Sequence, residues 1–85
     1  MIEIKWTKLA ADDLAYWKKH NLSIYNKIKL LIKNIQQTPF KGIGKPELLK
    51  YSLSNLWSRR ITKEHKLVYG IKGKTIIIYQ CRFHY

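Results

Sequence analysis

A run of four apolar residues near the end of the chain, Ile76-Ile77-Ile78-Tyr79, constrains the fold more than any other feature. Successive side chains of a β-strand point to opposite faces, so a strand that is apolar at every position is typical of the centre of a sheet. The segments 57–62, 66–71 and 75–82 are all rich in β-branched and aromatic residues, and Lys72-Gly73-Lys74 fits a turn between the last two. The last third of the chain is therefore predicted to be a sheet.

The first half of the chain has the pattern of one short strand and two helices. Residues 2–6 alternate weakly and predict a strand, and Thr7 is a suitable N-cap for a helix that ends near Lys18–His20. A second helix is predicted from Ser23 until Thr38-Pro39 stops it. Its apolar residues recur at helical spacing and form one stripe: Ile24, Ile28, Leu31, Ile32 and Ile35.

These elements predict a single α+β domain over residues 1–85, in the order β-α-α-β-β-β. The two N-terminal helices form a hairpin that packs on one face of a mainly antiparallel sheet. The segment 39–46 holds both prolines and two of the four glycines, so it is predicted to be a loop. Residues 46–50 are expected to form a short turn of helix.

The charge balance predicts a polyanionic partner. Seventeen Lys and Arg residues face five Asp and Glu residues, which gives a formal net charge of +12 and a pI near 10.0. Nucleic acid is the first candidate partner and an acidic protein the second. A membrane surface ranks third, because it calls for a basic amphipathic helix with a strongly apolar face. A basic surface without a function is the remaining alternative.

The cysteine content and the N-terminal residues favour a cytoplasmic protein. Cys81 is the one cysteine, so the fold has no internal disulfide, which suits a reducing compartment. We expect no secretory signal and no membrane span. Cys81 and His84 have C-x-x-H spacing, but a zinc site needs three or four ligands and no second pair is present. No metal and no cofactor are therefore expected.

Cleavage of RNA without a metal requires a base for the ribose 2′-OH, an acid for the leaving 5′-oxygen and cations for the phosphorane. Glu47 lies among lysines and is expected to be ionised, which makes it a candidate base; a salt bridge or a helix cap is an equally good interpretation. His84 is a candidate acid, because an imidazole titrates near pH ~6.5. A frayed terminal histidine is the alternative that the residues alone favour.

Strand parity groups the candidate cations. Arg60, Lys66 and Arg82 are predicted to line a single sheet surface opposite the helices. Three aromatic residues nearby could stack bases, as in proteins that bind single-stranded RNA: Tyr51, Phe83 and Tyr85. A solvated strand face is the alternative for any one of these charges.

Five segments carry motifs in a fixed order: Thr38-Pro39-Phe40, Gly44-Lys45-Pro46-Glu47-x-Leu49-Lys50, Trp57-Ser58-Arg59-Arg60-Ile61-Thr62, Glu64-His65-Lys66-Leu67-Val68-Tyr69 and Cys81-Arg82-x-His84-Tyr85. Together they resemble the YoeB/Txe toxins of the RelE superfamily along essentially the whole chain. The resemblance implies a microbial RNase fold and the toxin of a type II toxin–antitoxin system. It also implies a ribosome-dependent, metal-independent endoribonuclease, which cleaves mRNA in the A site by 2′-OH attack on the scissile phosphate and so inhibits translation.

The resemblance implies the partners as well. They are a YefM-like antitoxin, whose acidic C-terminal segment folds onto the toxin, the mRNA, and the 70S ribosome with its rRNA. Operator DNA is expected to be bound only through the toxin–antitoxin complex, which represses its own operon. A homodimer of the toxin is a further assembly that we consider.

Carried over by position, the resemblance gives each site residue a role. Glu47 is implied as the general base and His84 as the general acid, with Tyr85 closing the active site beside it. Lys66 takes the place of the arginine that stabilises the phosphorane. The residues implied to contact phosphates or ribosomal RNA are Lys45, Lys50, Arg59 and Arg60. Strand parity adds Arg82 to this set.

Two departures from the family pattern matter. The motif usually reads Glu-His-Arg-Leu-Val-Tyr, and Lys66 replaces its arginine with a point charge that lacks a bidentate fork, so weaker stabilisation is expected. Asn55 stands where glycine is common, and asparagine tolerates the left-handed conformation. Lys66 keeps open a non-cleaving basic module that binds RNA or ribosomes, or a co-repressor of its operon. A DNA-binding regulator acting alone is a third alternative, but no helix-turn-helix signal is present.

Overall fold

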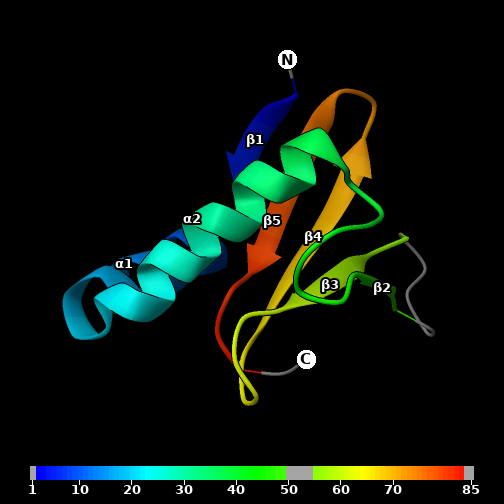
Figure 1. Ribbon diagram of the computed structural model, residues 1–85. Coiled ribbons are helices and arrows are strands. Elements are labelled where there is room, and N and C mark those ends of the chain that lie inside the picture. Colours follow the sequence, from blue (N-terminus) through cyan, green and yellow to red (C-terminus); the bar gives the residue numbers. More distant parts are fainter. Residues whose placement is uncertain (1, 50–54, 84–85) are drawn as a thin grey trace.

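The computed structural model describes residues 2–49 and 55–83 and has the expected α+β architecture (Figure 1). Its elements are β1 (Glu3–Trp6), α1 (Lys8–His20), α2 (Leu22–Gln37), β2 (Glu47–Leu48), β3 (Trp57–Arg60), β4 (Lys66–Lys72) and β5 (Thr75–Gln80). The strands form a sheet in the order β1-β5-β4-β3-β2, in which β1 is parallel to β5 and the other pairs are antiparallel. The predicted fold class, two N-terminal helices on a mainly antiparallel sheet, is confirmed.

Short polar residues set the boundaries of both helices. The Thr7 hydroxyl accepts a hydrogen bond from the Ala10 amide at 3.1 Å and caps α1. Asn21 ends α1 with its backbone N–H and begins α2 with its side-chain oxygen, which accepts from the Ile24 amide at 3.2 Å. One residue therefore joins the two helices into a tight hairpin. Neither helix, in the part of the chain that the structure describes, is long and apolar enough to cross a membrane.

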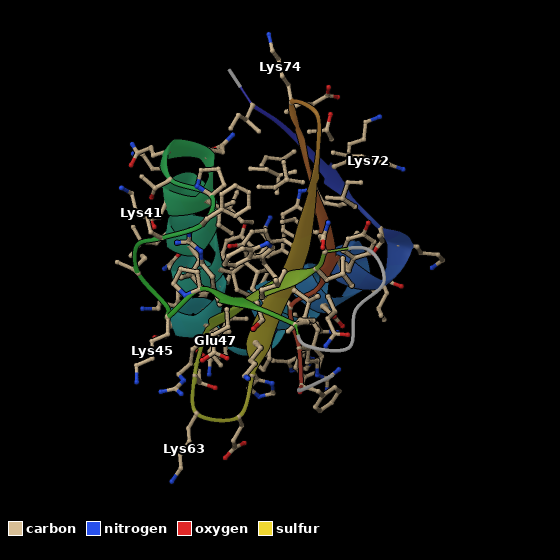
Figure 2. The ribbon with its side chains drawn as sticks, turned by 90° about the vertical axis from the view of Figure 1, so that its right-hand side faces the viewer. Lys41, Lys45, Glu47, Lys63, Lys72 and Lys74 are labelled. Atoms are coloured by element: carbon tan, nitrogen blue, oxygen red, sulfur yellow. The ribbon has the colours of Figure 1, made fainter. Side chains whose placement is uncertain are left out.

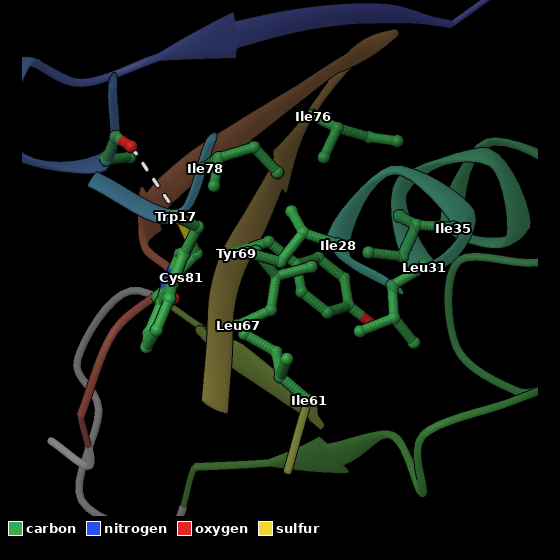
Figure 3. Close-up of a cluster of buried hydrophobic side chains, with 11 residues drawn as sticks. Trp17, Ile28, Leu31, Ile35, Ile61, Leu67, Tyr69, Ile76, Ile78 and Cys81 are labelled. Carbon is green, nitrogen blue, oxygen red and sulfur yellow. Dashed lines mark hydrogen bonds between the residues drawn. The ribbon is translucent and has the colours of Figure 1, made fainter. Parts of the chain in front are cut away.

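The helices pack on one face of the sheet, which we call the inner face (Figure 3). The fully buried side chains of α2 meet the inward side chains of β4 and β5: Ile28, Leu31 and Ile35 against Leu67, Tyr69, Ile76 and Ile78. Ile77, between two of these residues, points to the opposite face and is only partly buried. That opposite, outer face carries the polar side chains described below.

Residues 47 and 48 are a strand, not the short helical turn that the sequence predicted for residues 46–50. Glu47 lies opposite Ser58 and Leu48 opposite Trp57, and the Leu49 amide donates to the Leu56 carbonyl at 2.9 Å. The physical reason is that β3 would otherwise leave a row of backbone groups unpaired at the edge of the sheet. Lys50 lies outside the described residues.

The first and last of the three predicted C-terminal strands are shorter than expected. β3 ends at Arg60, because the amides of Ile61 and Thr62 donate to the His65 carbonyl at 3.0 and 3.2 Å and close the turn. β5 ends at Gln80, after a shift in register opposite β4. Asn55 has a φ of 52°, the left-handed conformation expected where the family has glycine.

Candidate active site

Side chains on the outer face of the sheet line a small recess. They come from three neighbouring strands and from the loop before β2: Lys45, Glu47, Ser58, Arg60 and Lys66. Figure 2 shows Lys45 and Glu47 next to each other on this part of the molecule. Four of the five are residues that the sequence predicted for the site, and folding brings these four together.

The pairing of the strands explains why these side chains meet. Glu47 on β2 lies opposite Ser58 on β3, and Arg60 lies opposite Lys66 on β4. The Cβ atoms of directly opposed residues in an antiparallel pair are about 4.5–5.5 Å apart. Arg60 follows Ser58 by two positions, so it shares the same face and is a diagonal neighbour of Glu47. The result is one carboxylate beside the side chains of two cations.

Ser58 is the recess residue that we did not predict. It lies between Glu47 and Val68 in the sheet and is 2% exposed. Its parity with Arg60 was visible in the sequence. A serine on that face, between the predicted base and a cation, was the signal that could have identified it.

The loop between α2 and β2 brings Lys45 and Glu47 to β3. The Gly44 carbonyl accepts a hydrogen bond from the Arg60 amide at 2.6 Å. Gly44 has a φ of 81°, and a Cβ at this position would lie 2.8 Å from Leu31 Cδ2 and 3.2 Å from the Arg60 carbonyl oxygen. Only glycine therefore allows the loop to approach β3 so closely in this conformation.

Arg59 holds the same loop from the inner face. Its side chain is fully buried, and its guanidinium donates hydrogen bonds to the carbonyls of Thr38 (2.6 Å), Lys41 (3.0 Å) and Ile43 (3.0 Å), to Asn34 Oδ1 and to the Tyr69 hydroxyl (3.2 Å). The prediction that Arg59 contacts RNA is wrong, because the side chain has no exposed surface and its donors are used inside the protein. Arg59 instead fixes the loop that carries part of the recess.

Arg82 is separate from the recess. Its guanidinium carbon lies 3.5 Å from the centroid of the Tyr16 ring on α1 and 4.5 Å from that of Phe83. The prediction that Arg82 shares a surface with Arg60 and Lys66 is wrong. It assumed that strand alternation continues to residue 82, whereas β5 ends at Gln80. Arg82 makes a cation–π contact with α1 instead.

The segment after β5 runs back to the start of β4 (Figure 1). The Phe83 carbonyl accepts a hydrogen bond from the Lys66 amide at 3.1 Å, and the Phe83 amide donates to His65 Nδ1 at 2.8 Å. The Phe83 side chain is 57% exposed. The predicted residues Tyr51, His84 and Tyr85 lie outside the described residues, but His84 is bonded to a residue that is itself hydrogen-bonded to Lys66.

The buried titratable groups on the inner side offer no reactive nucleophile. Burial raises the pKa of the Cys81 thiol to about 12, with a further contribution from the Asp13 carboxylate, so the thiol is protonated at neutral pH. Burial also raises the pKa of Asp13, whose carboxylate accepts the Cys81 amide at 3.1 Å. Within residues 2–49 and 55–83, no three His, Cys, Asp or Glu side chains are grouped so that they could hold a metal ion.

A family model for the YoeB-like toxins of bacterial type II toxin–antitoxin systems matches residues 6–85. The chain belongs to this family. Toxin YoeB of Escherichia coli strain K12 is 46% identical over 84 residues, which cover 99% of this chain and 100% of that toxin. Toxin YoeB of Synechocystis sp. is also 46% identical over 84 residues, 99% of this chain and 98% of that toxin. The resemblance to the YoeB/Txe toxins is thus confirmed.

Solved structures of YoeB toxins have the same fold. A YoeB/ParE toxin from Agrobacterium tumefaciens superposes with a TM-score of 0.93 at 43% identity, covering 99% of this chain and 100% of the other. The YoeB dimer from Staphylococcus aureus superposes with a TM-score of 0.92 at 38% identity, covering 99% of this chain and 98% of the other. A chain of the YoeB-YefM complex from the same species superposes with a TM-score of 0.89 at 38% identity, covering 100% of this chain and 99% of the other. This chain is therefore a YoeB-type toxin of a toxin–antitoxin system.

Proposed function

We propose that this toxin is a ribosome-dependent, metal-independent endoribonuclease that cleaves mRNA in the A site and so inhibits translation. The observation that carries the proposal is the recess, in which a carboxylate and three cationic side chains from separate elements line one surface. Carboxylates are scarce in this chain, with five Asp and Glu residues against seventeen Lys and Arg. A carboxylate placed among cations in a recess is the arrangement that acid–base chemistry on a phosphodiester requires.

The proposed reaction assigns a task to each side of the recess. Glu47 takes the proton from the ribose 2′-OH, which attacks the adjacent phosphorus and forms a 2′,3′-cyclic phosphate. Arg60 and Lys66 stabilise the additional negative charge of the phosphorane. His84 gives a proton to the 5′-oxygen as the P–O bond breaks, and Tyr85 encloses the reacting groups.

The covalent structure supports the role of His84. Its neighbour Phe83 is hydrogen-bonded to the Lys66 backbone, so the chain end begins beside a residue that lines the recess. Lys50 is proposed to bind a phosphate of the mRNA, and Lys45, which is exposed at the rim, to contact the mRNA or the ribosomal RNA.

The partner that restrains the toxin is proposed to be a YefM-like antitoxin with an acidic C-terminal segment. The YoeB-YefM structures from Staphylococcus aureus support this partner. The net charge of +12 supports the acidic character of the segment. We propose that operator DNA is bound by the toxin–antitoxin complex and that the toxin acts in the cytoplasm, where the ribosomes are. The Staphylococcus aureus YoeB dimer supports a homodimer of the free toxin.

Lys66 favours one alternative function, a toxin that binds ribosomes without cutting mRNA. Lysine lacks the planar fork with which arginine holds two phosphate oxygens, so a toxin with weak transition-state stabilisation could bind ribosomes without cutting mRNA. Such a module would inhibit translation by occupancy, or would act only as a co-repressor of its operon.

Primer extension on translated mRNA separates the two functions. Purified toxin, in the presence of a chelator, is expected to create new 5′ ends on ribosome-bound mRNA and none on free mRNA. A single 2′-deoxynucleotide at the cleaved position should abolish the cut, because the attacking hydroxyl is missing. Ribosome binding without any new 5′ end would overturn the proposed activity and favour the non-cleaving module.

A further inference from the structure

Residues 81–83, which lead to the proposed general acid, are held by hydrogen bonds from α1 and from the start of β4. The bonds are Cys81 N to Asp13 Oδ2 (3.1 Å), Trp17 Nε1 to the Cys81 carbonyl (2.8 Å), Phe83 N to His65 Nδ1 (2.8 Å) and Lys66 N to the Phe83 carbonyl (3.1 Å). Two of the three residues in this segment are thus bound through both their amide and their carbonyl. We call residues 81–83 the tether.

His65 is well suited to hold the tether, because its own position is fixed by other contacts. Its amide donates to the Thr62 hydroxyl at 3.2 Å, and its carbonyl accepts from the amides of Ile61 and Thr62. Its ring packs edge-on against Trp17, with 4.7 Å between centroids. In the bond from Phe83, Nδ1 of this ring is the acceptor.

The backbone of the tether needs such restraint. Phe83 has a φ of 65°, in the left-handed region that bulky residues seldom adopt without support. Releasing the Phe83 amide would let this residue, the last one before the proposed general acid, relax to an ordinary conformation.

We infer that His65, together with Trp17, is a positioning residue for the general acid. It does not touch the substrate; it fixes the tether, the segment to which the general acid is covalently joined. This inference rests on the proposed endoribonuclease function. It gives a task to a histidine that lies in the turn between β3 and β4.

A matched pair of variants tests the hydrogen bond of His65 apart from its ring. His65→Asn places an amide oxygen where Nδ1 lies and keeps the acceptor, whereas His65→Phe keeps the ring against Trp17 and loses the acceptor. Misplacing a catalytic group by about 1 Å can cost about 10²-fold in rate. In single-turnover cleavage of ribosome-bound mRNA, we expect His65→Phe to cut about 10- to 100-fold more slowly at saturation, with ribosome affinity unchanged, and His65→Asn to remain close to wild type.

A double-mutant comparison tests whether His65 acts through His84. In a His84→Ala background the acid is already missing, so adding His65→Phe should cause no further loss of rate. A loss that is as large in this background as in the wild type would overturn the inference, and so would a His65→Phe variant that cuts at the wild-type rate. His20→Asn, a change at an exposed histidine in α1, is the matched control and should leave the rate unchanged.

A second variant keeps the test decisive if His65→Phe does not fold. Trp17→Phe retains a large ring in the core but removes the donor to the Cys81 carbonyl. It should slow cleavage in the wild-type background and not in the His84→Ala background; equal slowing in both would contradict the inference. A wild-type toxin that cuts no mRNA would instead overturn the proposed function itself, which separates the two failures.

Discussion

Arg59 and Arg60 are neighbours in the sequence and lie on opposite faces of β3. Arg59 points to the inner face, is fully buried and donates to five acceptors, three of which are carbonyls of the loop between α2 and β2. Arg60 points to the outer face, is exposed and lines the recess with Glu47 and Lys66. The same side chain is therefore a structural element at one position and a candidate phosphate ligand at the next. The net charge of the chain includes both arginines and gives no information about their different roles.

Of these two arginines, Arg60 is the one at which we expect the larger effect on activity. We expect Arg60→Gln to lower the cleavage rate by about 10²–10³-fold, because it removes one charged donor from the developing phosphorane. The thermal midpoint should change little, since the side chain is exposed. Single-turnover cleavage and thermal unfolding measure the two effects. Lys63→Gln, at an exposed lysine in the β3–β4 turn, is the control and should keep full activity.

The largest expected effect on stability is at Arg59. Arg59→Lys keeps the charge but cannot serve five acceptors, so several partly buried acceptors lose their partners; we expect a loss of about 3 kcal/mol in the free energy of unfolding. Denaturant unfolding measures it, and Arg60→Lys is the matched control, with a change of less than about 0.5 kcal/mol. Equal losses for the two variants would remove the distinction between the faces of β3.

This comparison also shows what the sequence could predict. Alternation along β3 and β4 placed Arg60 and Lys66 on one face, and capping residues such as Thr7 gave the helix boundaries. The sequence could not place Arg59, because its acceptors belong to a loop whose path depends on a close approach at Gly44. It also misplaced Arg82, because β5 ends at Gln80 and strand alternation does not continue to residue 82.

Lys66 sharpens the comparison on the outer face. Lys66→Arg restores the residue usual in the family, and a fork that contacts two phosphate oxygens should preserve or raise the cleavage rate, by up to about 10-fold. Single-turnover cleavage with a fixed ribosome concentration measures the change. A clear fall in rate would mean that other residues of this recess are adapted to lysine.

The smallest effect is expected at a buried charge on the inner side. Burial raises the pKa of Asp13 in the folded state above its unfolded value of 3.8. Its contribution to stability is therefore fully present below pH 3.8 and is lost as the pH rises through the folded-state pKa. Asp13→Asn keeps an acceptor for the Cys81 amide and removes this dependence.

The free energy of unfolding is measured for Asp13→Asn and for the wild type, at acidic and at neutral pH. The wild type should be more stable relative to the variant at acidic pH than at pH 7. A difference that is independent of pH, or that changes in the opposite direction, would contradict the burial of this carboxylate.

The central claim is that the recess on the outer face cuts RNA, and Glu47→Gln tests it most directly. The substitution keeps the shape of the side chain and removes its basicity. Single-turnover cleavage of ribosome-bound mRNA is measured alongside ribosome affinity. We predict a rate about 10²–10⁴-fold below wild type with affinity retained. A variant that cuts as fast as the wild type, or one that loses rate and affinity in equal measure, would contradict the account.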